Sequence, residues 1–363
     1  MRNPEVGTKS EGMTRREIAT QTPEAASPSF GLSHSLGILS SPFVIPSVMR
    51  AAVITAPGET AVVETQVPQP TRTQVLVRIE GCGVCASNIP PWKGKPWFTY
   101  PMSPGALGHE AWGRVDKIGE EVADFRPGDR VAILSNHAYA DYDTCESSCA
   151  VKIPETLQDQ PFPGEPLGCA MNIFHRSEIG KDHTVAIVGV GFLGALLAQL
   201  TSAAGARVIA ISRRESALEL VRNTGVTETV KLDDASVRRI HDLTSGRLCD
   251  VVIECTGKQW PLDVAGEITR ERGRLVVAGY HQDGSRQINM QLWNWRGLDV
   301  INAHERDPAV YVAGIRHAIR AVEAGLLNPA PLYTHLFPLE RVGDALNMMV
   351  QRPDGFMKAL ITI

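Results

Sequence analysis

The sequence predicts an α/β fold that combines a β-rich part with a doubly wound parallel sheet. Short strand-like segments separated by Gly and Pro turns fill residues 49–152, a pattern typical of a β-rich, partly barrel-like domain. From about residue 172, apolar strand segments alternate with helical ones. Continuous apolar strands of this kind indicate a parallel sheet that is buried on both faces. A chain of 363 residues is long enough for two such domains.

The individual elements follow in order along the chain. Residues 1–48 mix Pro, Ser, Gly and Thr with scattered charge and show no period, so we expect a flexible N-terminal extension, or an upstream start that the core does not need. The β-rich part is predicted to contain the strands QVLVRIE, WGRVDKIG, RVAIL and CAVKIP. The parallel sheet is predicted to contain HTVAIVG, ARVIAIS, TETVKL, CDVVIECTG, GRLVVAGY and LDVINAH. From Pro308 the pattern predicts helix, strand, helix and strand.

Composition narrows the range of partners. A formal charge of −4 and a pI of about 6.2 give no reason to expect a nucleic-acid or anionic-membrane partner. Seven cysteines, an odd number spread through the chain, favour a reducing compartment, and we expect a cytoplasmic protein. The longest apolar run, VAIVGVGFLGALLAQL, is short for a membrane span and rich in glycine. No signal-peptide pattern is recognisable at the N-terminus.

The segment GVGFLG predicts a dinucleotide-binding turn. Gly189, Gly191 and Gly194 have the G-x-G-x-x-G spacing, with Phe192 and Leu193 between the last two. An apolar strand precedes the turn and a helical stretch follows it, which is the context of a Rossmann site. The pyrophosphate is expected at the helix N-terminus, where free N–H groups and the helix dipole favour an anion.

The end of the next strand indicates which dinucleotide is preferred. NAD sites usually place Asp or Glu here to bind the ribose hydroxyls. This chain has Ser212, followed by Arg213 and Arg214. A hydroxyl and a guanidinium accept a 2′-phosphate that a carboxylate would repel, so we expect NADP(H). The alternative is that both arginines merely form the solvated start of the next helix.

The stretch GCGVCASNIPPW raises the question of a metal. Cys82 and Cys85 form a C-x-x-C pair, and His109 and Glu110 follow 24 residues after Cys85. Thiolate, imidazole and carboxylate are all zinc ligands, and a catalytic zinc uses three of them with one position open. Only Cys85 is expected to be a ligand, whereas Cys82 ends a predicted strand and is expected to be a packed thiol.

The order of several motifs resembles that of medium-chain, zinc-dependent alcohol and polyol dehydrogenases. The resemblance covers residues 49–363 and rests on GVCASN, GHEAWGRV, RPGDRVA, EPLGCA, GVGFLG and THLFPLERVGDAL. It implies a GroES-like catalytic domain from residues 49–171 and 308–363, with a Rossmann domain at 172–307. It also implies a homodimer or homotetramer.

The resemblance assigns roles to particular positions. Cys85 and His109 resemble the first two ligands of the catalytic zinc. Glu110 and Glu165 both resemble acidic residues of the polyol-type branch, and the choice between them stays open. Cys169, four residues after Glu165, is a further candidate ligand. Ser87 resembles the hydroxyl residue that binds the substrate oxygen and starts the proton path.

Two positions depart from the family pattern, and one metal site is missing. Asn88 stands where the family usually has Asp, which removes a negative charge near the metal. Pro90 stands where many members have the histidine that passes the proton to solvent. The four-cysteine lobe of a structural zinc is reduced here to Cys145 and Cys149, so we expect one catalytic zinc and no structural zinc.

Other residues are candidates for the walls of the site. The aromatic residues between the two proposed ligands are expected either to line the substrate cleft or to pack a Pro-rich loop; they are Trp92, Trp97, Phe98 and Tyr100. By resemblance, His304 and Arg306 follow a strand whose end lies near the nicotinamide. Lys358 is expected either near the metal or as a solvated strand residue.

Together these features predict a zinc-dependent oxidoreductase that moves a hydride between NADP(H) and an alcohol or polyol, or the matching carbonyl compound. One alternative is a zinc-free quinone or enoyl reductase of the same superfamily. Another is a cofactor-binding protein without catalysis, which the missing relay histidine leaves open.

Overall fold

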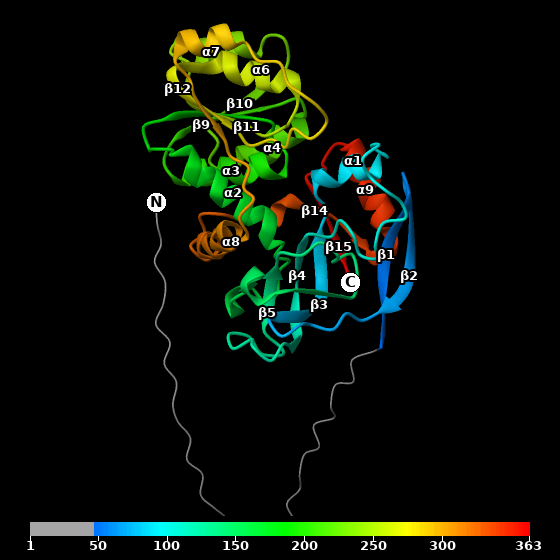
Figure 1. Ribbon diagram of the computed structural model, residues 1–363. Helices are drawn as coiled ribbons and strands as arrows, with labels where there is room; N and C mark the ends of the chain where they lie inside the picture. The colour runs from blue at the N-terminus through cyan, green and yellow to red at the C-terminus, as the bar shows by residue number, and fades with distance from the viewer. Residues whose placement is uncertain (1–46) are drawn as a thin grey trace, which may run out of the picture. The chain divides into compact units, whose positions relative to one another are not determined.

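Six short apolar segments form a parallel sheet in the second half of the chain. The computed structural model describes residues 47–363, and its parallel sheet has the order β10-β9-β8-β11-β12-β13 (Figure 1). These strands are β8 (Thr184–Val188), β9 (Arg207–Ser212), β10 (Glu228–Lys231), β11 (Cys249–Glu254), β12 (Thr269–Val277) and β13 (Asp299–Asn302). Because β9 and β11 lie on opposite sides of β8, a crevice opens at the carboxyl ends of these strands, where α/β sheets bind ligands. The predicted doubly wound sheet is confirmed.

Helices connect these strands and cover the sheet. Their apolar residues pack on strands that are almost entirely buried, as expected for a parallel sheet with both faces covered. The helices of this region are α2 (Gly164–Ser177), α3 (Phe192–Ala203), α4 (Glu215–Arg222), α5 (Ser236–Leu243), α6 (Gln259–Ile268) and α7 (Met290–Arg296). The domain boundary predicted after residue 171 falls inside α2, which is one continuous helix. The domain boundaries themselves stay a prediction.

A mostly antiparallel sheet forms the β-rich part. Its order is β14-β15-β3-β4-β5-β7, with β6 also paired to β3 and a separate β1–β2 hairpin. The strands are β1 (Val48–Ala56), β2 (Glu59–Gln66), β3 (Gln74–Gly83), β4 (Glu110–Ile118), β5 (Arg130–Ile133), β6 (Tyr142–Glu146), β7 (Ala150–Lys152), β14 (Tyr333–Pro338) and β15 (Lys358–Thr362). The predicted flexible extension, apart from its last two residues, lies outside the described residues.

The C-terminal segment returns to this sheet. After α8 (Pro308–Glu323) the chain forms β14, α9 (Val342–Gln351) and β15, which is the helix, strand, helix and strand that the sequence predicts. β15 pairs antiparallel with β3, with Ile361 opposite Cys82, and α8 packs against α2. The last strand of the chain therefore borders the strand that leads into the Cys85 segment.

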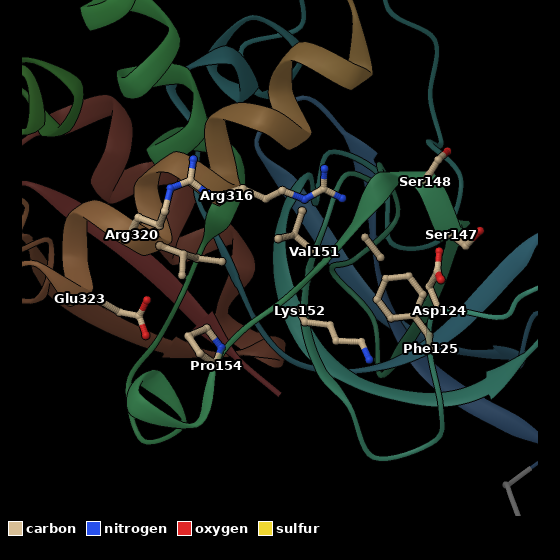
Figure 2. Close-up of a pocket in the computed structure, with 12 residues that line it drawn as sticks. Asp124, Phe125, Ser147, Ser148, Val151, Lys152, Pro154, Arg316, Arg320 and Glu323 are labelled. Atoms are coloured by element: carbon tan, nitrogen blue, oxygen red, sulfur yellow. The ribbon is translucent and has the colours of Figure 1, made fainter.

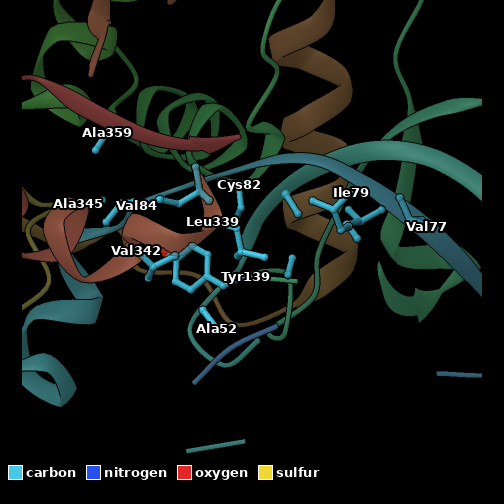
Figure 3. Packing of buried hydrophobic residues seen from close by; sticks show 14 of the residues in the cluster. Ala52, Val77, Ile79, Cys82, Val84, Tyr139, Leu339, Val342, Ala345 and Ala359 are labelled. Carbon is cyan, nitrogen blue, oxygen red and sulfur yellow. The ribbon is translucent and has the colours of Figure 1, made fainter. Parts of the chain in front are cut away.

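The core of the β-rich part joins early and late segments of the sequence. Figure 3 shows Tyr139 beside Val342 and Leu339, with β3 residues crossing above them. Cys82 belongs to this cluster and is fully buried, so the expectation of a packed thiol is confirmed. Burial raises the pKa of the Cys82 thiol well above its ordinary value, which keeps it protonated and unsuited to bind a metal. No helix within residues 47–363 is long and apolar enough to cross a membrane.

Candidate functional site

Strand pairing brings Cys85 and His109 together. β3 and β4 run antiparallel, and Gly83 at the end of β3 lies opposite Glu110 at the start of β4. Cys85 follows Gly83 by two residues, and His109 precedes Glu110 by one, so both leave the sheet at the same edge. A short 3-10 turn, Ala86–Asn88, begins directly after Cys85 and carries Ser87.

The three side chains form a donor set that fits a metal. The Cys85 sulfur, one ring nitrogen of His109 and one carboxylate oxygen of Glu110 lie within 4.8 Å of one another. His109 Nδ1 lies 2.8 Å from the carbonyl of Leu107, so Nδ1 donates its proton and Nε2 is left as the metal-binding atom. Glu110 Oε1 is buried and has no hydrogen-bond partner among the residues that the structure describes. Soft sulfur, imidazole and carboxylate in one cluster suit Zn²⁺.

Charges around His109 also favour a cation. Burial alone lowers the pKa of the imidazole, but the neighbouring Cys85 thiolate and the carboxylates of Glu165 and Glu110 raise it to about 10. An imidazole in this setting holds a proton at neutral pH unless another cation takes its place. A bound Zn²⁺ supplies that charge and displaces the proton.

The two candidate glutamates have different surroundings. Glu110 is fully buried and forms an ion pair with Lys358 of β15. Glu165 lies in the first turn of α2 and accepts a hydrogen bond from the Cys169 thiol at 3.2 Å. Burial raises the pKa of Glu165, and His109 opposes that shift. The 4.8 Å cluster contains Glu110 and not Glu165 or Cys169.

Lys358 is a buried residue of this site. Of the two expectations for Lys358, the solvated strand residue is wrong, because its side chain is 4% exposed. Its ammonium also lies 4.8 Å from the ring centroid of Phe192 in the GVGFLG turn. Gly83 makes room for the Glu110 carboxylate, since a Cβ at Gly83 would collide with Glu110 Oε2.

Asn88 and Ser87 surround His109. Ser87 Oγ lies 3.4 Å from His109 Nε2. The buried Asn88 amide donates to Tyr139 Oη at 2.9 Å and to the Leu107 carbonyl at 3.3 Å. That carbonyl is the one that orients His109, and Leu107 presents it from a strained backbone with φ of 73°. Asn88 thus supports the imidazole through an amide donor that an aspartate lacks.

The nucleotide turn has the predicted geometry. Gly189 has φ of 102°, a conformation that favours glycine. A Cβ at Gly194 would collide with the Gly189 carbonyl, so the third glycine permits the close packing of α3 on β8. Gly191 caps α3, and Phe192 and Leu193 begin the helix.

Ser212, Arg213 and Arg214, at the end of β9 and directly after it, make different contacts. Ser212 is buried, and its Oγ accepts the backbone N–H of Arg214 at 3.2 Å. Arg213 is exposed. The Arg214 guanidinium donates to the carbonyls of Phe356 and Val190. Of the two arginines, Arg214 lines the cleft around Cys85 and Arg213 does not.

One cleft of about 620 Å³ contains the metal cluster and the nucleotide turn. It is lined by Cys85, Ser87, His109, Glu110, Glu165 and residues 191–194, together with His304. Arg306 is not among its lining residues, and neither are the four aromatic residues expected as a wall. Trp92 is buried instead and donates to Asn347. The aromatic-wall expectation is therefore wrong, and the alternative of loop packing holds for Trp92.

Sequence reasoning missed several residues that line this cleft. They are Lys93, Lys95, Tyr311 and Arg352. The two lysines directly follow the Ser87 segment, so their position in the sequence is a signal for them. Tyr311 and Arg352 come from α8 and from the end of α9, and no local pattern connects them with Cys85.

A second pocket lies elsewhere, between α8 and the β7 region. Figure 2 shows Arg316, Arg320 and Glu323 of α8 facing Val151 and Lys152. The pocket has a volume of about 560 Å³ and is lined by none of the predicted site residues. The cleft around Cys85 is therefore the candidate active site.

Comparison with known proteins agrees with this geometry. The alcohol dehydrogenase GroES-like domain family matches residues 71–172, and the zinc-binding dehydrogenase family matches residues 193–316. The chain belongs to the medium-chain dehydrogenase/reductase superfamily. Several of the relatives that it matches are sorbitol or other polyol dehydrogenases. The match confirms the resemblance and the GroES-like and Rossmann architecture.

Individual relatives of this medium-chain dehydrogenase are distant but span it almost completely. Human sorbitol dehydrogenase is 26% identical over 81% of this chain and 90% of its own length. Erythritol/L-threitol dehydrogenase of Mycolicibacterium smegmatis is 26% identical over 87% and 98%. A putative zinc-binding dehydrogenase from Sinorhizobium meliloti, solved with NADP, is 26% identical with a TM-score of 0.76, over 88% and 100%.

Proposed function

We propose that this medium-chain dehydrogenase is a zinc-dependent oxidoreductase that transfers a hydride between NADP(H) and an alcohol or polyol, or the corresponding ketone or aldehyde. The observation that carries the proposal is the shared cleft, in which the Cys85, His109 and Glu110 donor set faces the GVGFLG turn. Sorbitol and erythritol/L-threitol dehydrogenases among the relatives support a polyol substrate. A zinc-free reductase has no use for this donor set.

We assign separate roles in metal binding and proton transfer to the residues of the cleft. Cys85 and His109 would hold zinc, with Glu110 or Glu165 as the third ligand. Zinc held there would supply the Lewis acid that polarises a carbonyl or lowers the pKa of an alcohol, and the nicotinamide would supply or accept the hydride. Ser87 Oγ lies 3.4 Å from His109 Nε2, so Ser87 would accept the proton of a substrate hydroxyl held at this point while it passes its own hydroxyl proton to water. Pro90 has no group to pass that proton on, so water in the cleft would carry it to solvent.

The preference for NADP(H) rests on Ser212 and Arg213. Strand β9 ends at Ser212, without a carboxylate, and the exposed Arg213 would pair with the 2′-phosphate. The relative from Sinorhizobium meliloti was solved with NADP, which agrees with this choice.

We also propose one zinc per chain, a cytoplasmic location and a homodimer or homotetramer. Cys145 is buried in the core and Cys149 packs against it, which suits packing thiols. Burial raises the pKa of the Cys145 thiol well above its ordinary value, and such a thiol binds metal poorly. For assembly, the region around the edge strand β13 exposes apolar side chains: Ile288, Met290, Trp295 and Val300. Exposed apolar groups at a sheet edge favour contact with a second copy.

Metal analysis and kinetics on purified protein test the proposal. We expect one zinc per chain and a higher kcat/KM with NADPH than with NADH. Cys85→Ser should abolish turnover while NADPH binding survives, and Cys149→Ser is the matched control. Full activity with less than half a zinc per chain would refute the mechanism, and a clear NADH preference would refute the choice of cofactor.

A further inference from the structure

Two lysines give the cleft an unmatched positive charge. Lys93 and Lys95 line it beside Ser87 and Pro90. The lining side chains include six cations, counting Lys93, Lys95, Arg214, Lys258, Arg352 and Lys358, against the four carboxylates of Glu110, Glu165, Asp283 and Glu305. The protein as a whole has a formal charge of −4, so the cleft differs in sign from the average of the chain.

The other lysines of the cleft are neutralised. Lys258 pairs with Asp283, and Lys358 pairs with Glu110. The Glu305 carboxylate accepts backbone N–H groups of the two residues that follow it. Neither Lys93 nor Lys95 has an ion-pair or side-chain hydrogen-bond partner within residues 47–363. The Lys95 ammonium lies 6.0 Å from the centroid of the Trp97 ring, a contact that uses none of its N–H donors, so both charges are available to a ligand.

The lysines are carried by a firmly held backbone. Lys93 N–H donates to the Ile89 carbonyl at 2.9 Å and Lys95 N–H donates to the Pro90 carbonyl at 3.1 Å. Between the two lysines, Gly94 N–H donates to the Pro91 carbonyl at 3.2 Å. The buried Trp92 anchors this turn to α9 through a 3.0 Å bond from its indole nitrogen to Asn347 Oδ1. A backbone fixed in this way reduces the entropy lost when a ligand binds.

The lysines belong to the substrate side of the cleft. They continue the segment that carries Ser87, through α1 (Ile89–Trp92), whereas the cofactor pyrophosphate has its own site at the N-terminus of α3. A substrate whose hydroxyl lies at Ser87 therefore has ammonium groups on the same segment for a second, anionic end.

We infer that the substrate of this dehydrogenase is a polyol phosphate, with its phosphate held by Lys93 and Lys95. The inference rests on the proposed function and narrows its substrate class. Two ammonium groups offer six N–H donors as mobile point charges. They match a phosphomonoester, which carries a charge of about −1.5 to −2 and three acceptor oxygens at neutral pH. A carboxylate has one charge and two acceptor oxygens, so it matches fewer of these donors than a phosphate does.

The test compares substrates on the zinc-loaded enzyme. Sorbitol 6-phosphate, neutral sorbitol and the carboxylate gluconate are assayed with NADP⁺, and binding of sorbitol 6-phosphate is measured by calorimetry. We expect the phosphate to be preferred. Lys93→Gln and Lys95→Gln should each lower kcat/KM for it about tenfold and leave sorbitol turnover and the cofactor KM unchanged. Lys181→Gln, an exposed lysine outside the cleft, is the control.

Each outcome decides the inference. Equal use of sorbitol and its phosphate, preference for gluconate, or a raised cofactor KM in the lysine variants overturns it while the proposed function stands. If no alcohol or carbonyl compound is turned over, the proposed function fails and calorimetry alone decides. Binding of sorbitol 6-phosphate that weakens about tenfold in each lysine variant then supports the inference, and absent or unchanged binding overturns it.

Discussion

Replacing Lys358 by methionine should strongly destabilise the protein. Methionine keeps most of the aliphatic stem of Lys358 but removes its charge, which leaves the buried Glu110 carboxylate without its ion-pair partner. The two side chains are 4% and 1% exposed, so solvent screening is negligible and the small values typical of surface ion pairs do not apply. Removing one partner of a buried pair costs about 3–5 kcal/mol. We expect a loss of that size in the free energy of unfolding.

Urea denaturation of the zinc-free protein measures this loss, because a bound metal would itself compensate Glu110. The double variant Lys358→Met/Glu110→Gln removes both charges and should be more stable than the sum of the single changes implies, by at least about 2 kcal/mol. A loss below about 1 kcal/mol for Lys358→Met, or additive effects in the double variant, would show that the pair is not a buried unit.

Three further predictions concern zinc affinity, cofactor preference and the paired thiols. Below pH 10, zinc must displace a proton from His109, so apparent zinc affinity should rise about tenfold per pH unit between pH 7 and 9. Competition with a coloured chelator measures this affinity, and an affinity that does not change with pH would contradict the raised pKa of His109. Arg213→Met should reduce the ratio of NADPH to NADH kcat/KM about tenfold, whereas Arg214→Met should mainly lower the melting temperature because its carbonyl contacts are lost; equal effects on the ratio would refute this division. The double variant Cys145→Ser/Cys149→Ser should keep its zinc content, and loss of zinc would reveal a metal role for these thiols.

Much of the fold could be predicted because each strand is marked by a local run of apolar residues in the sequence. Apolar runs such as HTVAIVG are typical of a parallel sheet that is covered on both faces. In the turn at residues 189–194, Gly189 adopts a positive φ and Gly194 permits close packing, as the glycine spacing predicts. The ligand roles of Cys85 and His109 were predicted from the order of motifs that resembles medium-chain dehydrogenases, with Glu110 and Glu165 left as alternatives, and the pairing of β3 with β4 places Glu110 beside the first two.

The remaining features depend on contacts between distant segments. Nothing near Arg214 in the sequence indicates that its guanidinium would be taken by the carbonyl of Phe356. The aromatic residues after Pro91 were predicted either to line the cleft or to pack a loop. Trp92 is buried in the core and donates a hydrogen bond to Asn347 of α9, a residue far away in the sequence. For Lys358 the sequence left open a place near the metal and a solvated strand position, because the carboxylate with which it pairs lies 248 positions earlier.

Because β15 pairs with β3, the candidate metal site contains residues that are synthesised at very different times. Cys85, His109 and Glu110 are synthesised in the first third of the chain, but the ammonium that neutralises Glu110 lies among its last six residues. A nascent chain that has made all its metal-binding groups therefore still lacks the charge that lets them pack together. Removal of the last six residues would therefore take away the ammonium partner of Glu110 and leave Cys85, His109 and Glu110 themselves unchanged.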